Sequence, residues 1–222
     1  MRPVNKGDSP RDYIDYGQAR HDLAERIGYY CSYCEMKVYQ GIEVEHILPV
    51  NQGGDELEWD NFLLSCKYCN TRKSDHNDNL SDYVWPDIDN TDLVFEYSEA
   101  SVVTPQKGLS LELNQKAQQT IDLMKLDLFA DNTTEADTRW RSRKEAWDLA
   151  RKSYNSWDEA PIVEMARVIA RTSLSGHYSI WMTVFRDVPE VLKEIDEVYR
   201  CKGLYKEYDE DGNRIVRPGG CI

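Results

Sequence analysis

Residues 31–76 carry the pattern that decides the fold, CSYCEMKVYQGIEVEHILPVNQGGDELEWDNFLLSCKYCNTRKSDH. This segment holds two pairs of cysteines with the same spacing, Cys31-x2-Cys34 and Cys66-x2-Cys69. Two such pairs supply the four thiolates that zinc binds in closed, tetrahedral structural sites. We therefore expect a structural Zn2+ bound by all four cysteines, because buried free cysteines would not need this spacing.

The residues between and after the cysteine pairs predict two strands and a helix. Residues 42–48 alternate in polarity and include β-branched side chains, which favours a strand that ends at Pro49. Residues 51–54, Asn-Gln-Gly-Gly, indicate a loop. Residues 62–64 are apolar and predict a second strand or a packing segment, and the stretch that Cys66 opens suits a short helix.

This segment contains a histidine, an acidic residue and an asparagine that could together catalyse the hydrolysis of a phosphodiester. This reaction needs a base that activates water and a cation that neutralises the developing charge. His46 on the first strand could supply the base, and the adjacent Glu45 could bind a cation. Asn70, on the predicted helix, offers the neutral oxygen that a hard cation accepts.

With this spacing, the segment resembles the HNH endonuclease motif in its four-cysteine form. The resemblance implies a ββα-metal core in which His46 is the general base and Asn61 steadies the loop that bears it. It also implies that Lys73 lies near the scissile phosphate.

The same resemblance implies a second ion, Mg2+ or another divalent cation, bound by Glu45 and Asn70. This sequence has Glu45 where the family usually has aspartate, which lengthens the arm by one methylene. His76, one turn beyond the motif lysine, is an alternative ligand to Asn70.

The rest of the chain is mainly helical, so the predicted fold class is α+β. Helices are expected at residues 11–27, 110–127, 139–154, 160–174 and 188–200, a strand at 93–97, and a hairpin around residues 211–213. We predict an HNH nuclease domain with an N-terminal helix at 1–80, a connecting β segment at 81–108, and a helical domain at 109–222 that could dock a partner.

The composition favours a folded, cytoplasmic protein. Hydrophobic residues make up 41% of the chain, and no apolar run approaches the roughly 20 residues that a membrane span needs. We expect no membrane association and no export signal. A reducing compartment fits thiolate ligands, and it leaves Cys201 and Cys221 as free thiols.

The net charge of −13 is unusual for a protein that binds nucleic acid. The acidity could serve solubility, or a partner could deliver the substrate. The strongest basic run could be a solvated helix face or a contact to the DNA backbone, and its members are Arg139, Arg141, Arg143, Lys144, Arg151 and Lys152. We expect His21 to lie at the surface and His177 to have a packing role.

Outside the motif, the opening Met-Arg-Pro-Val-Asn-Lys-Gly and the helices that flank the motif resemble a looser bacterial HNH family. It includes the nuclease subunit of Septu-type and retron-linked anti-phage systems. This resemblance implies an ATPase partner that regulates the nuclease, with DNA as substrate and RNA not excluded. The competing hypothesis is a non-catalytic zinc-knuckle module that binds protein or nucleic acid.

Overall fold

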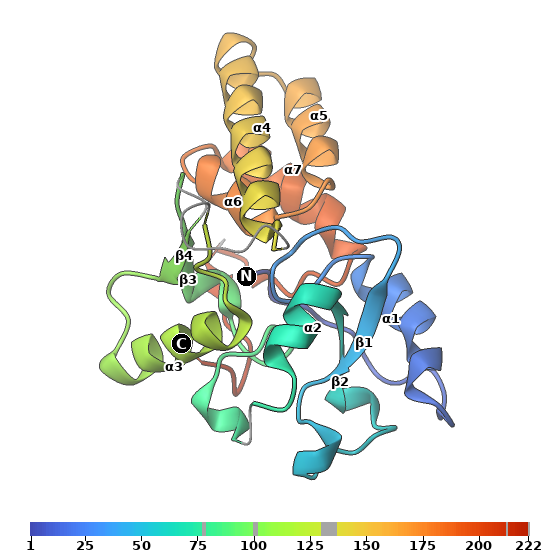
Figure 1. The fold of residues 1–222 in the computed structure, drawn as a ribbon. Coiled ribbons are helices and arrows are strands. Elements are labelled where there is room, and N and C mark those ends of the chain that lie inside the picture. The colour runs from blue at the N-terminus through green and yellow to red at the C-terminus, as the bar shows by residue number, and fades with distance from the viewer. Residues whose placement is uncertain (77–78, 100–101, 130–136, 212, 222) are drawn as a thin grey trace.

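The structure is a computed structural model that describes residues 1–76, 79–99, 102–129, 137–211 and 213–221 (Figure 1). Its content is mixed α and β, in agreement with the predicted class. Within these residues the strands pair into two-stranded antiparallel sheets, β1 with β2, β3 with β4 and β5 with β6.

The elements at the cysteine pairs follow each other directly. Strand β1 (Ile42–His46) pairs with β2 (Phe62–Cys66), with Ile42 opposite Cys66 and His46 opposite Phe62. Helix α2 (Lys67–Lys73) starts at the residue after β2. All five residues of β2 are buried, because helix α1 (Ala19–Ile27) and α2 both pack against the strand pair. The predicted strands and short helix are confirmed.

The first helix is shorter than predicted. The Asp15 side chain accepts a hydrogen bond from the Gly17 amide and starts a 3-10 turn, η1 (Tyr16–Gln18), before α1 begins at Ala19. Ile14, which lies within the predicted helix 11–27, precedes the observed helix and is 87% exposed. An aspartate that caps a turn competes with helical backbone, which explains the late start.

Short elements connect the strands and helices. They are η2 (Val50–Gln52), η3 (Trp59–Asn61), η4 (Leu80–Asp82), η5 (Thr91–Leu93), β3 (Phe95–Tyr97) and β4 (Val103–Pro105). The predicted strand at 93–97 is therefore confirmed in its second half. The predicted C-terminal hairpin forms as β5 (Glu207–Tyr208) and β6 (Arg214–Ile215), although Gly212 of its turn lies outside the described residues.

The four helices predicted after residue 108 are present. They are α3 (Leu111–Met124), α4 (Arg139–Glu159), α5 (Val163–Ser173) and α7 (Pro189–Arg200). A further helix, α6 (Tyr178–Val184), was not predicted. Five of its seven residues are buried, so its sequence lacks the polar face that reveals an amphipathic helix.

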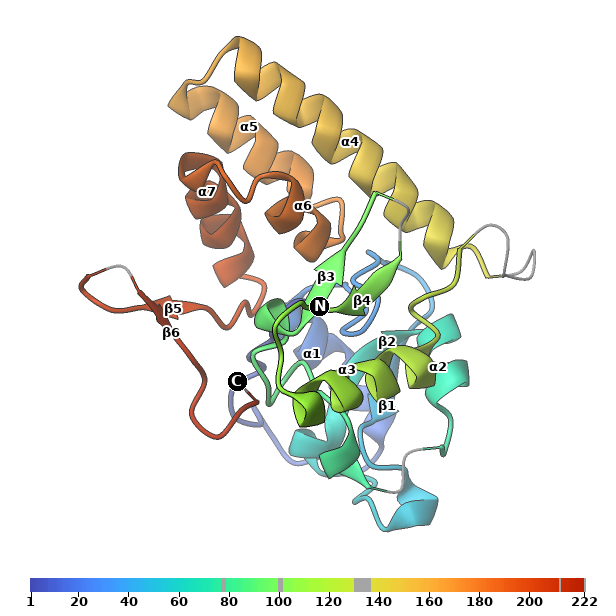
Figure 2. The same cartoon turned by 90° about the vertical axis from the view of Figure 1, so that its left-hand side faces the viewer.

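Helices α4 and α5 form a hairpin that projects away from the β1–β2 pair (Figures 1 and 2). Helix α2 lies against this strand pair, and α3 packs against α2 and β4. The buried hydrophobic residues form a cluster that runs from Met1 through the cysteines to Leu204. None of the described helices is both long and apolar enough to cross a membrane.

Candidate functional site

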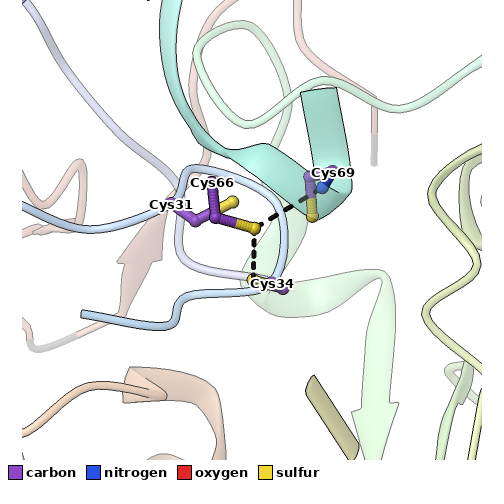
Figure 3. Close-up of side chains that lie close together, drawn as sticks. All are labelled: Cys31, Cys34, Cys66 and Cys69. Carbon is purple, nitrogen blue, oxygen red and sulfur yellow. Dashed lines mark hydrogen bonds between the residues drawn. The ribbon is translucent and has the colours of Figure 1, made fainter. Parts of the chain in front are cut away.

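The four predicted zinc ligands converge in the core. Their sulfur atoms all lie within 4.8 Å of one another, and none of the four residues is more than 3% exposed. Cys31 and Cys34 come from the turn after α1, whereas Cys66 ends β2 and Cys69 lies in the first turn of α2 (Figure 3). The pairing of β1 with β2 brings the two knuckles together.

The geometry of this cluster fits zinc. The Cys34 and Cys66 sulfurs are 3.7 Å apart, and two ligands of a tetrahedral zinc with ~2.3 Å bonds are separated by about 3.8 Å. The Cys69 amide also donates to Cys66 Sγ at 3.5 Å (Figure 3). Four buried thiols with this spacing make a site for structural zinc, and no ligand position remains for a substrate.

Two members of the basic run lie next to this cluster, and for these two both interpretations of the run were wrong. Arg139 and Arg143 are each 1% exposed, so they form neither a solvated face nor a DNA contact. Arg139 Nη1 donates to Cys69 Sγ at 3.1 Å. Other members face solvent, as Arg141 does. Neighbouring residues of a helix point to different sides, so a run of basic residues has both buried and exposed members.

One face of β1 contacts α2 through two polar pairs. Asn70 Nδ2 donates to Glu43 Oε2 at 2.7 Å, and Lys73 Nζ lies 3.0 Å from Glu45 Oε2. Residues two apart in a strand share a face, and residues three apart in a helix do as well. The structure therefore brings Asn70 to Glu43, and it places Glu45 beside Lys73.

Glu45 and Lys73 form a buried ion pair. Their side chains are 2% and 1% exposed, Tyr33 Oη donates to Glu45 Oε1, and Lys73 Nζ also donates to the His46 carbonyl. Burial raises the pKa of Glu45 to about 7, and the attraction of Lys73 opposes this only in part. The two groups are thus engaged with each other and with the protein, away from solvent.

His46 lies at the end of β1, and its side chain contacts different residues from those that Glu45 contacts. Its ring meets the rings of Tyr16 and Phe62 edge-on, at centroid distances of 5.0 and 5.3 Å. Its Nε2 is 3.0 Å from the carbonyl oxygen of Glu56. Adjacent residues of a strand point to opposite faces, so His46 and Glu45 diverge.

Asn61 clamps the loop that follows His46. Its Oδ1 accepts from the Leu48 amide at 2.8 Å, and its Nδ2 donates to the carbonyls of Leu48 and Asp55 at 3.0 and 2.9 Å. Gly54 allows this arrangement, because a Cβ there would meet the Leu48 carbonyl oxygen at 2.0 Å.

His76 lies beyond the end of α2 and apart from the polar pairs on β1. Its side chain is 69% exposed, and Nδ1 is 3.9 Å from Asp75 Oδ1. Together with Arg72 and Lys125 it lines a cavity of about 570 Å³ between α2 and α3.

The remaining histidines and cysteines lie elsewhere. His21 is 70% exposed on α1. His177 is buried before α6, where its Nε2 is 2.8 Å from Ser142 Oγ, and burial lowers its pKa to about 4. Cys201 is exposed, and Cys221 is half-buried. These places agree with the surface, packing and free-thiol roles expected for them.

Comparison with known proteins addresses the same segment. Residues 31–76 match the family model described as HNH endonuclease. These residues form an HNH endonuclease domain. The domain indicates that the chain is a nuclease that hydrolyses phosphodiester bonds. It therefore implies a nucleic-acid substrate. No curated protein matches the sequence significantly. The division of the chain at residues 80 and 108 stays a prediction.

The sequence did not reveal the contacts of four residues around this domain. Tyr33 and Glu43 contact the predicted set directly, Gly54 makes the loop clamp sterically feasible, and Arg139 contacts a cysteine sulfur. Glu43 had a signal, because it is two residues before Glu45 in a predicted strand. Arg139 had none, since 69 residues separate it from Cys69.

Proposed function

We propose that the HNH domain is a metal-dependent DNA endonuclease with a ββα-metal core of β1, β2 and α2, in which His46 is the general base. The orientation of His46 carries this proposal. A carbonyl oxygen only accepts, so the 3.0 Å contact to Glu56 assigns the proton to Nε2. Nδ1 then keeps its lone pair, as activation of water requires.

The ring contacts support the same role. Tyr16 and Phe62 limit rotation of the imidazole, and Asn61 fixes the loop that leads to Glu56. A base that is held by packing and by one backbone acceptor is ready for proton transfer without reorganisation. We assign Asn61 as a positioning residue rather than a catalytic one, because its hydrogen bonds are to the loop backbone.

The second face of β1 offers donors for a divalent cation. Carboxylate and amide oxygens suit Mg2+ and similar hard ions, and Glu43, Glu45 and Asn70 supply them between β1 and α2. These oxygens would hold such an ion, which would supply Lewis-acid chemistry by neutralising negative charge on the phosphate. Asn70 with Glu43 is the better placed pair, because Glu45 is engaged by Lys73 and Tyr33.

We assign Lys73 a different role from the one that the resemblance implied. Its ammonium is 1% exposed and bridges Glu45 and the His46 carbonyl. Lys73 therefore holds α2 against β1 rather than contacting the phosphate. Cations that are available to a DNA backbone lie nearby at Arg72 and Lys125, which line the cavity beside His76.

The wider assignment rests on the resemblance of the flanking sequence. We propose that this nuclease is a cytoplasmic subunit of a bacterial anti-phage complex with an ATPase partner. The net charge of −13 supports a requirement for a partner, because the chain alone repels a polyanion at long range. The exposed apolar residues of the α4–α5 region, Leu149, Ile162, Val163 and Val168, provide a surface for such contact.

Plasmid nicking by the full chain tests the catalytic assignment. The protein is incubated with supercoiled DNA or with RNA and Mg2+ or Mn2+, with and without the protein that the neighbouring gene encodes. His46→Ala is expected to reduce nicking by about 10²- to 10⁴-fold, the usual contribution of a general base.

His21→Ala is the matched control, because this histidine is 70% exposed on α1. It is expected to nick DNA at the wild-type rate. Wild-type nicking by folded His46→Ala protein would overturn the assignment of the base. Preferential degradation of RNA would leave the assignment of His46 as the base intact and would reject DNA as the substrate.

A further inference from the structure

Two buried arginines of α4 lie next to the cysteine cluster, although they belong to a helix outside the matched segment. Arg139 and Arg143 are four residues apart, so they share one face of the helix. Each is 1% exposed. A guanidinium is buried at a large free-energy penalty unless charges and acceptors compensate for it. The burial of both guanidiniums therefore requires acceptors or negative charges close to them.

Arg139 uses all five of its N–H groups. Nη1 donates to Cys69 Sγ at 3.1 Å and to the Met124 carbonyl at 2.8 Å. Nε and Nη2 donate to the two carboxylate oxygens of Asp137 at 2.9 and 2.8 Å, and Nη2 also donates to the Lys125 carbonyl at 3.2 Å. The guanidinium is thus fixed in one orientation, with one N–H directed at a cysteine sulfur.

Arg143 adds a second cation one turn further along α4. Its Nη2 donates to the Leu128 carbonyl at 2.6 Å. Burial lowers the pKa of Arg143, and its interactions with Cys34 and Cys69 oppose this in part. The ion pair of Arg139 with Asp137 is neutral, so Arg143 leaves one net positive charge beside the cluster.

This charge pattern matches a metal–thiolate centre. Four thiolates and one Zn2+ carry a net charge of −2 in a site from which water is excluded. A hydrogen bond to a ligand sulfur and a nearby buried cation both stabilise such a dianion. Without the metal and its thiolates, Arg139 keeps Asp137 but loses the charged acceptor at Cys69, and Arg143 loses the negative charge at Cys34 and Cys69.

We infer that the zinc centre is a joint between the HNH domain and α4, held by the Arg139 contact to Cys69 and the charge of Arg143. Zinc occupancy keeps the first turns of α4 against the domain, and the arginines in turn slow zinc release. The coupling is reciprocal, because each partner stabilises the state that the other binds. This inference rests on zinc in the cysteine cluster and is independent of the nuclease chemistry.

Zinc release from the full chain tests the role of Arg139. Zinc-loaded protein is mixed with a chelating dye, and the release rate and the zinc affinity are measured. Arg139→Met is expected to weaken zinc retention by about 10- to 100-fold, as for other residues that hydrogen bond to a metal ligand. Arg139→Lys keeps the charge but lacks the planar fork, and an intermediate effect is expected.

Arg141→Met is the matched control, because Arg141 is exposed on the same helix. It is expected to release zinc at the wild-type rate. If folded Arg139→Met protein releases zinc no faster than Arg141→Met, the inference is wrong. The release rate does not depend on catalysis, so this outcome is distinct from a failure of the nuclease assignment.

Hydrogen exchange of the wild-type protein tests the joint without any substitution. Removal of zinc is expected to reduce the protection of α2 amides and of the first three turns of α4 together. Helices α5 and α7 pack against each other and should keep their protection. Unchanged protection in α4 would overturn the joint, and so would loss of protection across the whole chain, α5 and α7 included.

Discussion

The cysteine cluster and strand β1 lie in the same 46-residue match, yet they differ in how far the sequence defines them. The four cysteines all face one point and are buried, as their spacing predicts. On β1 the predicted partners separate, with Glu45 beside Lys73 and His46 beside Tyr16 and Phe62. Four cysteines form a site wherever their sulfur atoms come together. Adjacent residues of a strand, by contrast, point to opposite faces and so contact different residues.

A sequence motif therefore identifies candidate residues but does not show which of them contact one another. Glu45 is adjacent to His46 in sequence, but its carboxylate is engaged by Tyr33 and Lys73. Glu43, which the motif does not emphasise, is the residue that contacts Asn70.

Loss of one cysteine of the cluster should have the largest effect. Cys69→Ala removes one of four zinc ligands and the sulfur that Arg139 contacts. Since structural zinc sites contribute on the order of 10 kcal/mol to small domains, we expect loss of zinc and of the helical signal from α2 and the first turns of α4, while α5 and α7 stay folded. Zinc content and circular dichroism check this, with Cys201→Ala, an exposed cysteine, as the unchanged control.

Breaking the buried ion pair on β1 should have the next largest effect. Lys73→Met leaves the Glu45 carboxylate buried beside no cation, and we expect the free energy of unfolding to fall by about 3–5 kcal/mol. Urea denaturation measures this. The double variant with Glu45→Gln should recover much of the loss, because no buried charge then remains. A double variant as unstable as Lys73→Met would contradict the pairing.

The raised pKa of Glu45 predicts a pH dependence of stability. Its pKa is about 7 in the folded protein, against about 4.3 in an unfolded chain. Between these values the folded state binds more protons, so stability falls as pH rises, by about 1 kcal/mol per pH unit. Denaturation from pH 5.5 to 7.5 should show this slope in the wild type, and Glu45→Gln should reduce it. Equal slopes of stability against pH in the wild type and in Glu45→Gln would contradict the raised pKa of Glu45.

Release of the loop after His46 should have the smallest effect on stability among the three single substitutions, Cys69→Ala, Lys73→Met and Asn61→Ala. Asn61→Ala removes three hydrogen bonds to the backbone of Leu48 and Asp55, and a loss of roughly 1–3 kcal/mol is expected. Nicking should fall even where the protein is fully folded, because the loop also carries the Glu56 carbonyl that orients His46. Asn61→Asp keeps the acceptor for Leu48 and should be intermediate.

Much of the local structure could be predicted from the sequence. Alternation found β1, turn residues found the loop at 51–54, and helical periodicity found four helices after residue 108. Helix α6 was missed because it is buried on most sides, and the start of α1 was displaced by the Asp15 cap. Patterns report which face of an element meets solvent, so elements without a polar face give no signal.

The sequence by itself determined the zinc ligands and the HNH segment, since Cys-x2-Cys spacing places two sulfurs on one metal wherever the knuckles lie. Only the tertiary structure decided what the charged residues contact. It buried Arg139 against Cys69, paired Lys73 with Glu45, and turned His46 toward Tyr16 and Glu56. Such contacts join residues far apart in the chain, and their energy depends on burial, which no local pattern specifies.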